Sequence, residues 1–270
     1  MGLKKPPFLL KHIFLILAVI SITLVLSLLA SPSKDPETAK ISAEGPTENV
    51  KEEDKQNMVY INQRKSMVNN QIIARGISNA DVINAMLKVP REEFVLAEMK
   101  QYAHLDRPLP IAAGQTISQP YIVAIMTELL EPSKNDRVLE IGAGSGYQAA
   151  VLAEIVKEVY TIEIIEELSK VAAENLKKTG YNNVYVKHGD GYKGWKEKAP
   201  FDSIIITAAV KEIPQPLIDQ LKEGGKVILP KGDPRSYQNL VLGIKKDGKI
   251  EEVSITPVRF VPMTGEALSK

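Results

Sequence analysis

The distribution of hydrophobic and polar residues divides the 270-residue chain into three zones. Residues 1–30 begin with lysines and continue with an uncharged, mostly apolar run. Residues 31–57 are rich in Pro, Ser, Glu and Lys and have no aromatic residue, so they cannot bury enough apolar surface to offset the entropy of ordering. Residues 58–270 mix short apolar runs with amphipathic segments. We therefore expect a hydrophobic N-terminal segment, a disordered linker and one folded domain.

The apolar run from Ile13 to Ala30 has the length of a membrane span. At 1.5 Å per residue it reaches about 27 Å, close to the roughly 30 Å core of a bilayer. A signal peptide has the same layout, although Leu28 stands where a small residue is preferred before cleavage. An uncleaved anchor, a cleaved signal and initiation at Met58 or Met67 all stay open. The preceding lysines predict a cytoplasmic N-terminus, which would place the rest of an anchored chain outside.

Within residues 58–270, segments with strand and helix lengths follow one another. The periodicity predicts helices at 61–75, 79–88, 121–130, 147–155, 166–178 and 215–221. Apolar runs predict strands at 137–141, 158–162, 184–187, 203–207, 226–229, 239–245 and 250–260, the last two at one edge. Strands that alternate with helices predict an α/β fold: a doubly wound, mostly parallel sheet with helices on both faces, preceded by extra N-terminal helices. Ligands bind such sheets beyond the carboxyl ends of the strands.

A glycine-rich loop, Gly142–Gly146, follows one predicted strand and precedes a helix. Glycines at such a turn let the backbone bend sharply and approach a ligand closely, although an ordinary turn has the same composition. A dinucleotide fingerprint would place its third glycine at position 147, where this chain has Tyr147. The tighter G-x-G-x-G spacing after the acidic Glu140 resembles the first motif of class I methyltransferases, which bind S-adenosyl-L-methionine.

Two further acidic positions follow the next strands. Glu163 comes 21 residues after Gly142, where a carboxylate can accept hydrogen bonds from both ribose hydroxyls. Asp190 lies within Gly-Asp-Gly after the following strand and can accept from an adenine amino group. Taken singly, Glu163 is a solvated strand-end charge and Asp190 a turn or helix cap. Together the glycine loop, Glu163 and Asp190 at successive strand ends predict a cofactor site. The resemblance to class I methyltransferases implies that this site is formed by Glu140, Gly142, Gly144, Gly146, Glu163, Asp190 and Gly191.

Composition narrows the chemistry further. The net charge of +1 gives no indication of a nucleic-acid partner. The absence of cysteine excludes disulfides, thiolate metal ligands and a cysteine nucleophile. The three histidines are too scattered to suggest a metal site by spacing, and no metal is expected.

Three other segments extend the likeness beyond the glycine loop. Residues 114–121 read Gly-Gln-Thr-Ile-Ser-Gln-Pro-Tyr, residues 201–209 Phe-Asp-Ser-Ile-Ile-Ile-Thr-Ala-Ala, and residues 257–262 Pro-Val-Arg-Phe-Val-Pro. With the loop, they closely resemble the protein-L-isoaspartate O-methyltransferase family across about residues 62–267. The resemblance implies a class I methyltransferase fold with S-adenosyl-L-methionine as cofactor.

The resemblance also assigns roles to residues. The family's active-site serine maps to Ser118, whose plainer interpretation is a helix N-cap before Pro120; the two roles are compatible. Substrate-binding roles are implied for Gln115, Thr116, Thr207 and Arg259. For Arg259 the alternative is that it ties the edge strand to the body of the domain.

The implied reaction is methylation of the free carboxylate of L-isoaspartyl and D-aspartyl residues in damaged, flexible proteins, leading through a succinimide to normal aspartyl. A carboxylate is ionised at pH 7, so the lack of a strong catalytic base is no objection. A methyltransferase acting on another acceptor and a non-catalytic binding module are the alternatives. Cofactor supply and the family favour a cytoplasmic enzyme domain, with an inner-membrane anchor or export as the alternative.

Overall fold

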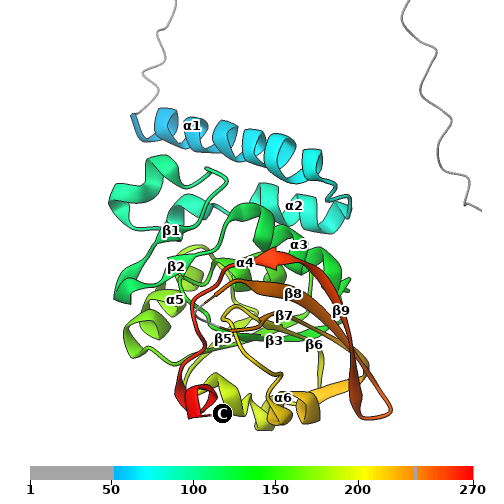
Figure 1. Ribbon diagram of the computed structural model, residues 1–270. Coiled ribbons are helices and arrows are strands. Elements are labelled where there is room, and N and C mark those ends of the chain that lie inside the picture. The colour runs from blue at the N-terminus through cyan, green and yellow to red at the C-terminus, as the bar shows by residue number, and fades with distance from the viewer. Residues whose placement is uncertain (1–51, 234–235, 270) are drawn as a thin grey trace, which may run out of the picture. The chain divides into compact units, whose positions relative to one another are not determined.

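The alternating strands and helices build a seven-stranded sheet with helices on both faces (Figure 1). This computed structural model describes residues 52–233 and 236–269. Its α-helices are α1 (Glu52–Met67), α2 (Ala80–Lys88), α3 (Pro120–Leu130), α4 (Tyr147–Ala153), α5 (Glu166–Lys178) and α6 (Gln215–Gln220). The large sheet contains β3 (Arg137–Ile141), β4 (Glu158–Glu163), β5 (Val184–His188), β6 (Phe201–Ile206), β7 (Leu221–Lys231), β8 (Gln238–Lys246) and β9 (Lys249–Val258). A separate ribbon pairs β1 (Leu109–Pro110) with β2 (Thr116–Ile117).

The strand order β5-β4-β3-β6-β7-β8-β9 confirms the predicted doubly wound α/β sheet. The first five strands in this order are parallel, whereas β8 and β9 are antiparallel additions at one edge. After β3 the chain moves to β4 on one side, and it later returns to β6 on the other. The carboxyl end of β3 therefore marks the switch point where ligands bind in open α/β sheets.

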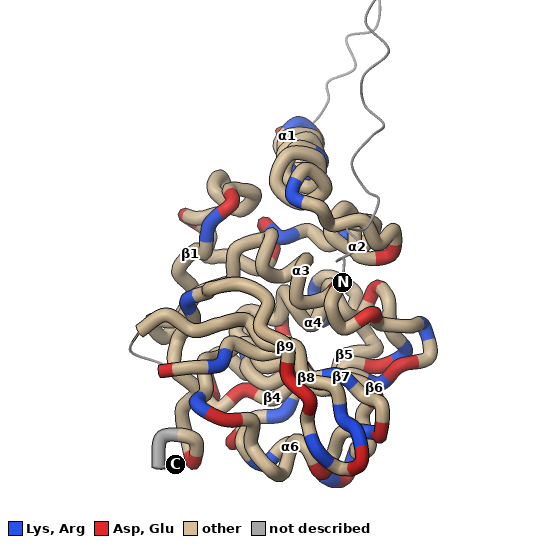
Figure 2. Tube along the Cα trace, turned by 45° about the vertical axis from the view of Figure 1, so that its right-hand side comes forward, with Lys and Arg blue, Asp and Glu red and all other residues tan. Residues whose placement is uncertain are grey.

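The sheet separates two hydrophobic cores. Val138 and Ile205 face one core with residues of α3, α4 and α5, while Leu139 and Ile204 face the other with residues of α6. This alternation follows from the two-residue period of a strand, and a strand buried on both faces is a continuous apolar run. Figure 2 shows few charged positions along α3 and α4, in keeping with their location between the N-terminal helices and the sheet.

Local sequence signals set several helix ends. Asn79 caps α2, because its side-chain oxygen accepts from the backbone N–H groups of Asp81 and Val82 at 2.9 and 3.2 Å. Pro120 occupies the first turn of α3, where its missing N–H costs nothing. The N-cap of α3 is Gln119, and no side chain caps it, so the interpretation of Ser118 as the helix cap is wrong.

The first helix begins earlier than the sequence predicts. Residues 52–57, assigned above to the disordered linker, form the first turns of α1. Glu52, Glu53 and Asp54 stand in its first turn, where acidic side chains are favoured by the helix dipole. The predicted apolar segment 1–30 and residues 31–51 of the linker lie outside the described residues. Among the described helices, none combines the length and apolarity needed to cross a membrane.

A buried ionic cluster attaches α1 to the loop that follows α2. Arg64 on α1 donates to Glu92 at 2.5 Å, and its guanidinium also reaches the carbonyl oxygen of Lys88 at 3.3 Å. The second carboxylate oxygen of Glu92 lies 3.3 Å from the buried ring of His104. Both Glu92 and His104 are almost fully buried, so the negative charge of Glu92 compensates a cation that has left water.

Replacing Glu92 with glutamine tests this attachment. The variant leaves Arg64 buried without its counter-charge, so we expect the free energy of unfolding at pH 7 to fall by about 3 kcal/mol or more, as measured by urea denaturation. The exposed Glu131, paired with Lys226, supplies the control: Glu131→Gln should change stability by less than about 1 kcal/mol. Equal effects in the two variants would contradict a special role for the buried cluster.

The same variant has a predicted pH dependence. Burial alone would raise the pKa of Glu92, but the hydrogen bond with His104 and the charge of Arg64 outweigh it, and the net pKa lies below the ordinary 4.5. A depressed carboxyl pKa contributes stability above its unfolded value, and this contribution is lost as pH falls through the folded value. The difference between wild type and Glu92→Gln should therefore shrink as the pH is lowered below 4.5.

Candidate active site

The glycine loop after β3 has a backbone that ordinary side chains do not tolerate. Gly142, Gly144 and Gly146 have φ angles of +97°, +53° and +89°. The N–H of Gly142 donates to the carbonyl of Ile162 at 2.8 Å, which holds the start of the loop against the end of β4. A Cβ added to Gly142 would lie 2.4 Å from the hydroxyl oxygen of Thr207, so this glycine is required by a close approach as well as by its φ.

Glu163 joins the two loops that flank the carboxyl end of β4. One of its carboxylate oxygens accepts from the N–H of Gly144 at 2.8 Å, and the other accepts from the N–H of Ile165 at 3.0 Å. The side chain is almost fully buried, yet it lines the pocket beside the loop. Because a carboxylate offers about four acceptor positions, lone pairs remain for a ligand.

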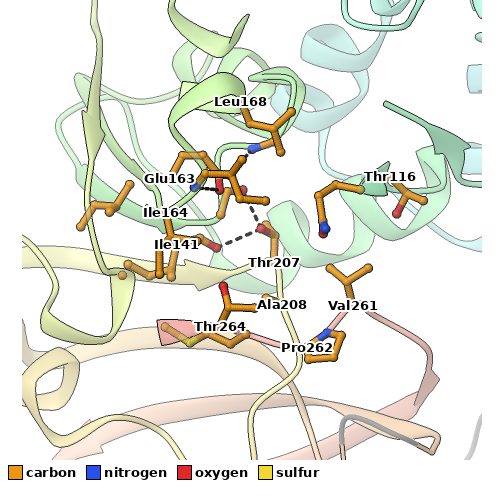
Figure 3. Close-up of a pocket in the computed structure, with 17 residues that line it drawn as sticks. Thr116, Ile141, Glu163, Ile164, Leu168, Thr207, Ala208, Val261, Pro262 and Thr264 are labelled. Atoms are coloured by element: carbon orange, nitrogen blue, oxygen red, sulfur yellow. Dashed lines mark hydrogen bonds between the residues drawn. The ribbon is translucent and has the colours of Figure 1, made fainter. Parts of the chain in front are cut away.

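Thr207 holds the glycine loop from the opposite side. Its hydroxyl lies 2.9 Å from the carbonyl oxygen of Ile141 and 2.7 Å from that of Gly142, and its backbone N–H also donates to Ile141. The residue directly follows β6, the parallel neighbour of β3. The loop is thus fixed by Glu163 from β4 and by Thr207 from β6 (Figure 3).

These strand ends enclose a pocket of about 650 Å³, including its open mouth. In Figure 3, Glu163 and Leu168 lie on one side of it, with Ala208, Pro262 and Thr264 on the other. The described residues that line it are Gln115, Thr116, Ile141, Gly142, Gly144, Ile162, Glu163, Ile164, Ile165, Leu168, Gly191, Thr207, Ala208, Val261, Pro262, Met263 and Thr264. None of these is Lys, Arg or His, and Glu163 is the single charged side chain among them. The pocket therefore suits a nucleoside without phosphates better than a dinucleotide.

A second pocket lies on the other side of the glycine loop. Its described lining residues are Thr116, Ile117, Ser118, Val123, Gly142, Ala143, Gly144, Ser145, Tyr147, Gln148 and Thr207. Ser118, half-buried just before α3, belongs to this pocket and not to the first. Four residues line both pockets, namely Thr116, Gly142, Gly144 and Thr207. The loop is consequently a shared wall, and ligands in the two pockets would meet beside it.

The structure does not bring every predicted residue to these pockets. Glu140 is fully buried beneath the loop, because alternation along β3 turns its side chain into the core. Gly146 faces α5, where an added Cβ would lie 3.1 Å from Leu176. Arg259 is exposed and lines neither pocket.

Asp190 adopts its plainer role as a cap, and it too lines neither pocket. One of its carboxylate oxygens accepts from the N–H of Tyr192 at 2.9 Å, and the other from the N–H of Glu266 at 2.9 Å. The adjacent Gly191 does line the first pocket. Asp190 thus ties the C-terminal segment to the end of β5.

The cofactor-site prediction missed that C-terminal segment. Val261 to Thr264 line the first pocket because backbone hydrogen bonds hold the segment beside Ala209, which donates to the carbonyl of Val261 at 2.8 Å and accepts from the N–H of Met263 at 2.9 Å. The only sequence signal for this segment was the family likeness of residues 257–262. Ile164 and Leu168 also line this pocket and are missing from the prediction. Because they follow Glu163 in the chain, the rule that ligands bind at strand ends could have identified them.

Three features together define a class I methyltransferase. They are the strand order, the glycine loop at the switch point and the acidic Glu163 at the end of β4. The family model of protein-L-isoaspartate(D-aspartate) O-methyltransferase matches residues 62–268. The chain belongs to this family, and it is therefore an S-adenosylmethionine-dependent methyltransferase.

Individual relatives agree with this assignment. Two relatives that are similar to this chain are named protein-L-isoaspartate O-methyltransferase 2. That from Shewanella sediminis is 55% identical over 209 residues, covering 77% of this chain and 86% of the relative. That from Syntrophobacter fumaroxidans is 58% identical over 186 residues, covering 68% and 75%.

Two solved structures are also similar. One named protein-L-isoaspartate O-methyltransferase has 32% identity and a TM-score of 0.70, covering 76% of this chain and 67% of that one. A Plasmodium falciparum beta-aspartate methyltransferase, solved in complex with S-adenosyl-L-homocysteine, has 29% identity and a TM-score of 0.66, covering 74% and 98%.

Glu140 gives a prediction about pH. Burial raises the pKa of Glu140 to about 8; the neighbouring Thr161 hydroxyl opposes this shift, and the negative charge of Glu163 adds to it. A carboxyl group with a raised folded pKa stays protonated in the fold, so the contribution of Glu140 to wild-type stability should fall as pH rises from about 4.5 to about 8.

Glu140→Gln, which carries a permanently neutral group of the same shape, should escape this loss. We expect the variant to gain in melting temperature relative to wild type as the pH rises from 5 to 8. Calorimetry across that range measures the effect, with the exposed Glu212→Gln as control. A constant difference between Glu140→Gln and wild type at all pH values would contradict the buried, protonated state.

Proposed function

We propose that this chain transfers a methyl group from S-adenosyl-L-methionine to the free carboxylate of L-isoaspartyl and D-aspartyl residues in damaged proteins. The supporting observation is that two pockets meet at one glycine loop, with the family's serine position, Ser118, in the second. Formation of the ester is followed by closure to a succinimide, which hydrolyses in part to normal aspartyl. The substrates are flexible isoaspartyl-containing proteins and peptides.

The residues of the first pocket fit S-adenosyl-L-methionine. Glu163 provides a carboxylate for the two ribose hydroxyls, and Ile162, Ile164 and Leu168 provide apolar surface for a flat base. Gln115 and Thr116 add polar groups that suit the amino-acid part of the ligand. When bound, this cofactor supplies an electrophilic methyl group on a positively charged sulfur. A pocket whose single charge is negative, and which has no lining cation, suits such a ligand.

Ser118 is proposed to orient the substrate carboxylate by hydrogen bonding. The backbone carbonyl of Ser118 accepts a hydrogen bond from Arg91, but the Ser118 hydroxyl has no hydrogen bond to another described residue. The hydroxyl is therefore available to the second pocket. Ile117, Val123 and Tyr147 form apolar parts of the same wall and exclude water from the acceptor. Alignment and desolvation are the main requirements, since an ionised carboxylate is already the nucleophile at pH 7.

The chemistry of the product explains how methylation leads to repair. In an isoaspartyl residue the chain continues through the side-chain carbonyl, so the α-carboxyl group is free. Methylation makes this carboxyl carbon electrophilic and turns its oxygen into a better leaving group. The nitrogen of the next residue then attacks, methanol leaves, and the succinimide forms. This step occurs in the released product and asks nothing further of the protein.

We propose that the enzyme domain works in the cytoplasm, where S-adenosyl-L-methionine is made. An uncleaved anchor, a cleaved signal, and initiation at Met58 or Met67 would each give a different mature chain. Mass spectrometry of the mature N-terminus, together with protease treatment of spheroplasts, distinguishes them. Digestion of the domain by external protease would overturn the cytoplasmic assignment, and protection from it is the expected result.

A methyl-transfer assay tests the proposed function. Purified protein with radiolabelled S-adenosyl-L-methionine should give base-labile methylation of an isoaspartyl peptide and none of the matching aspartyl peptide. Methylation of other acceptors alone would support a different methyltransferase. Cofactor binding without turnover on any acceptor would support a binding module. Either of these outcomes would overturn the proposal.

Ser118→Ala tests the role of the hydroxyl. The variant should bind S-adenosylhomocysteine as wild type does, because Ser118 does not line the first pocket, while kcat/KM for the isoaspartyl peptide falls about 100-fold. Calorimetric titration and steady-state kinetics measure the two quantities. The exposed Ser133→Ala is the matched control and should leave both unchanged. Normal turnover by Ser118→Ala would show that the hydroxyl has no role in positioning the substrate.

A further inference from the structure

Behind the second pocket lies a cation that the reaction described above does not use. Arg91 is fully buried, with 0% of its surface exposed. Its Nε donates to the carbonyl oxygen of Ala103 at 2.7 Å, and its Nη2 donates to the carbonyl oxygen of Ser118 at 2.7 Å. Its Nη1 is buried and has no hydrogen-bond partner.

The guanidinium lies directly behind two residues of the pocket wall. One is Ser118, through the hydrogen bond to its backbone carbonyl. The other is Tyr147, whose ring centroid is 4.6 Å from the guanidinium carbon. Arg91 itself does not line the pocket, so its charge can act on a ligand there only through this wall.

The charge of Arg91 is not balanced by the fold. Among the described residues, no carboxylate oxygen lies within 4 Å of its guanidinium nitrogens, whereas the neighbouring Arg64 has Glu92 at 2.5 Å. Burial lowers the pKa of Arg91, the direction expected for a cation moved out of water, although an arginine stays charged. A buried ion normally requires a partner of opposite charge, because its desolvation is costly.

We propose that Arg91 selects a negatively charged acceptor for the second pocket, with the substrate carboxylate as its missing counter-charge. This inference rests on the proposed function, since it assumes that the acceptor is a carboxylate. At an effective dielectric constant of about 20, the attraction between two opposite charges about 6 Å apart would raise the binding constant roughly 100-fold. Desolvation of the carboxylate offsets part of this gain, so we expect a net preference of about tenfold or more.

The proposal also predicts which kinetic constant changes. Methyl transfer neutralises both the carboxylate and the sulfonium, so a nearby fixed cation stabilises the bound substrate more than the transition state. Loss of the charge should therefore raise KM for the peptide with a smaller effect on kcat. Arg91 is thus a positioning and selecting residue rather than a catalytic one.

The experiment compares two peptide ligands that differ in charge and not in shape. One carries the isoaspartyl carboxylate, and the other has a carboxamide in its place. Dissociation constants for both are measured in the presence of saturating S-adenosylhomocysteine. Wild type should bind the carboxylate at least about tenfold more tightly than the amide. Arg91→Gln should lose most of this preference while still binding the amide, an outcome that general damage to the pocket would not give.

Two further variants separate charge from scaffolding. Arg91→Lys keeps the charge but loses the fork that holds two carbonyls, so it should retain the preference for the carboxylate even if turnover falls. Arg137→Gln removes a half-buried arginine at the amino end of β3, far from the pocket, and should leave the preference unchanged. If Arg91→Gln keeps the wild-type preference, or if Arg91→Lys folds and loses it, the proposal is overturned.

A measurement on wild type covers the case in which the Arg91 variants fail to fold. A buried charge is screened weakly by salt, so the preference should fall less than about threefold between 0.05 and 0.5 M KCl. Disappearance of the preference in high salt would assign it to exposed charges and overturn the role of Arg91. A wild type that shows no preference and no isoaspartyl methylation would instead show that the proposed function is wrong.

Discussion

The arrangement of the site depends on the two hydrogen bonds that the carboxylate of Glu163 accepts. It accepts from the backbone of the glycine loop with one oxygen and from the start of the loop into α5 with the other. Two loops from different strand ends are thereby held at one separation. Thr207, which follows β6, fixes the same glycine loop from the other side. The first pocket is the space left between elements that these two side chains hold in place, and so its shape is set before any ligand arrives.

The second pocket depends on the first through the loop that they share. A movement of Gly142 or Gly144 would change both pockets together, which suits a reaction between a cofactor in one and an acceptor in the other. The second pocket has its own support, because Arg91 holds the carbonyl of Ser118 from inside the domain. Nearby, Arg64 and Glu92 attach α1 to the segment that contains Arg91. The N-terminal helices therefore support the wall of the second pocket.

Much of the fold was predictable because its signals are local. The apolar run at β3 and the amphipathic pattern of α5 gave the observed bounds, since period and flanking residues determine both. The start of α1 at Glu52 was missed, because a polar helix stabilised by its acidic first turn has the composition of a linker. Gly142, Gly144, Glu163 and Gly191, which the rule that ligands bind at strand ends predicts for the site, line the first pocket.

The differences between the predicted site residues and the residues that line the pockets have physical causes that sequence alone does not reveal. A strand buried on both faces gives no periodic signal, so nothing indicated that Glu140 would turn into the core. The carboxylate of Asp190 accepts a hydrogen bond from the N–H of Glu266, a contact between residues far apart in the chain. A second long-range pairing, between the backbone of Ala209 and that of Val261 and Met263, brings Val261 to Thr264 to the first pocket. Such contacts follow from the completed fold and not from local pattern.

We propose that one glycine loop separates a cofactor pocket from a carboxylate pocket. The most direct test is a crystal structure with S-adenosylhomocysteine and an isoaspartyl peptide bound together. We expect the ribose hydroxyls on Glu163, the sulfur beside Gly142 and Thr207, and the free carboxylate against Ser118. A carboxylate bound away from Ser118, or a cofactor outside the pocket lined by Glu163, would contradict it.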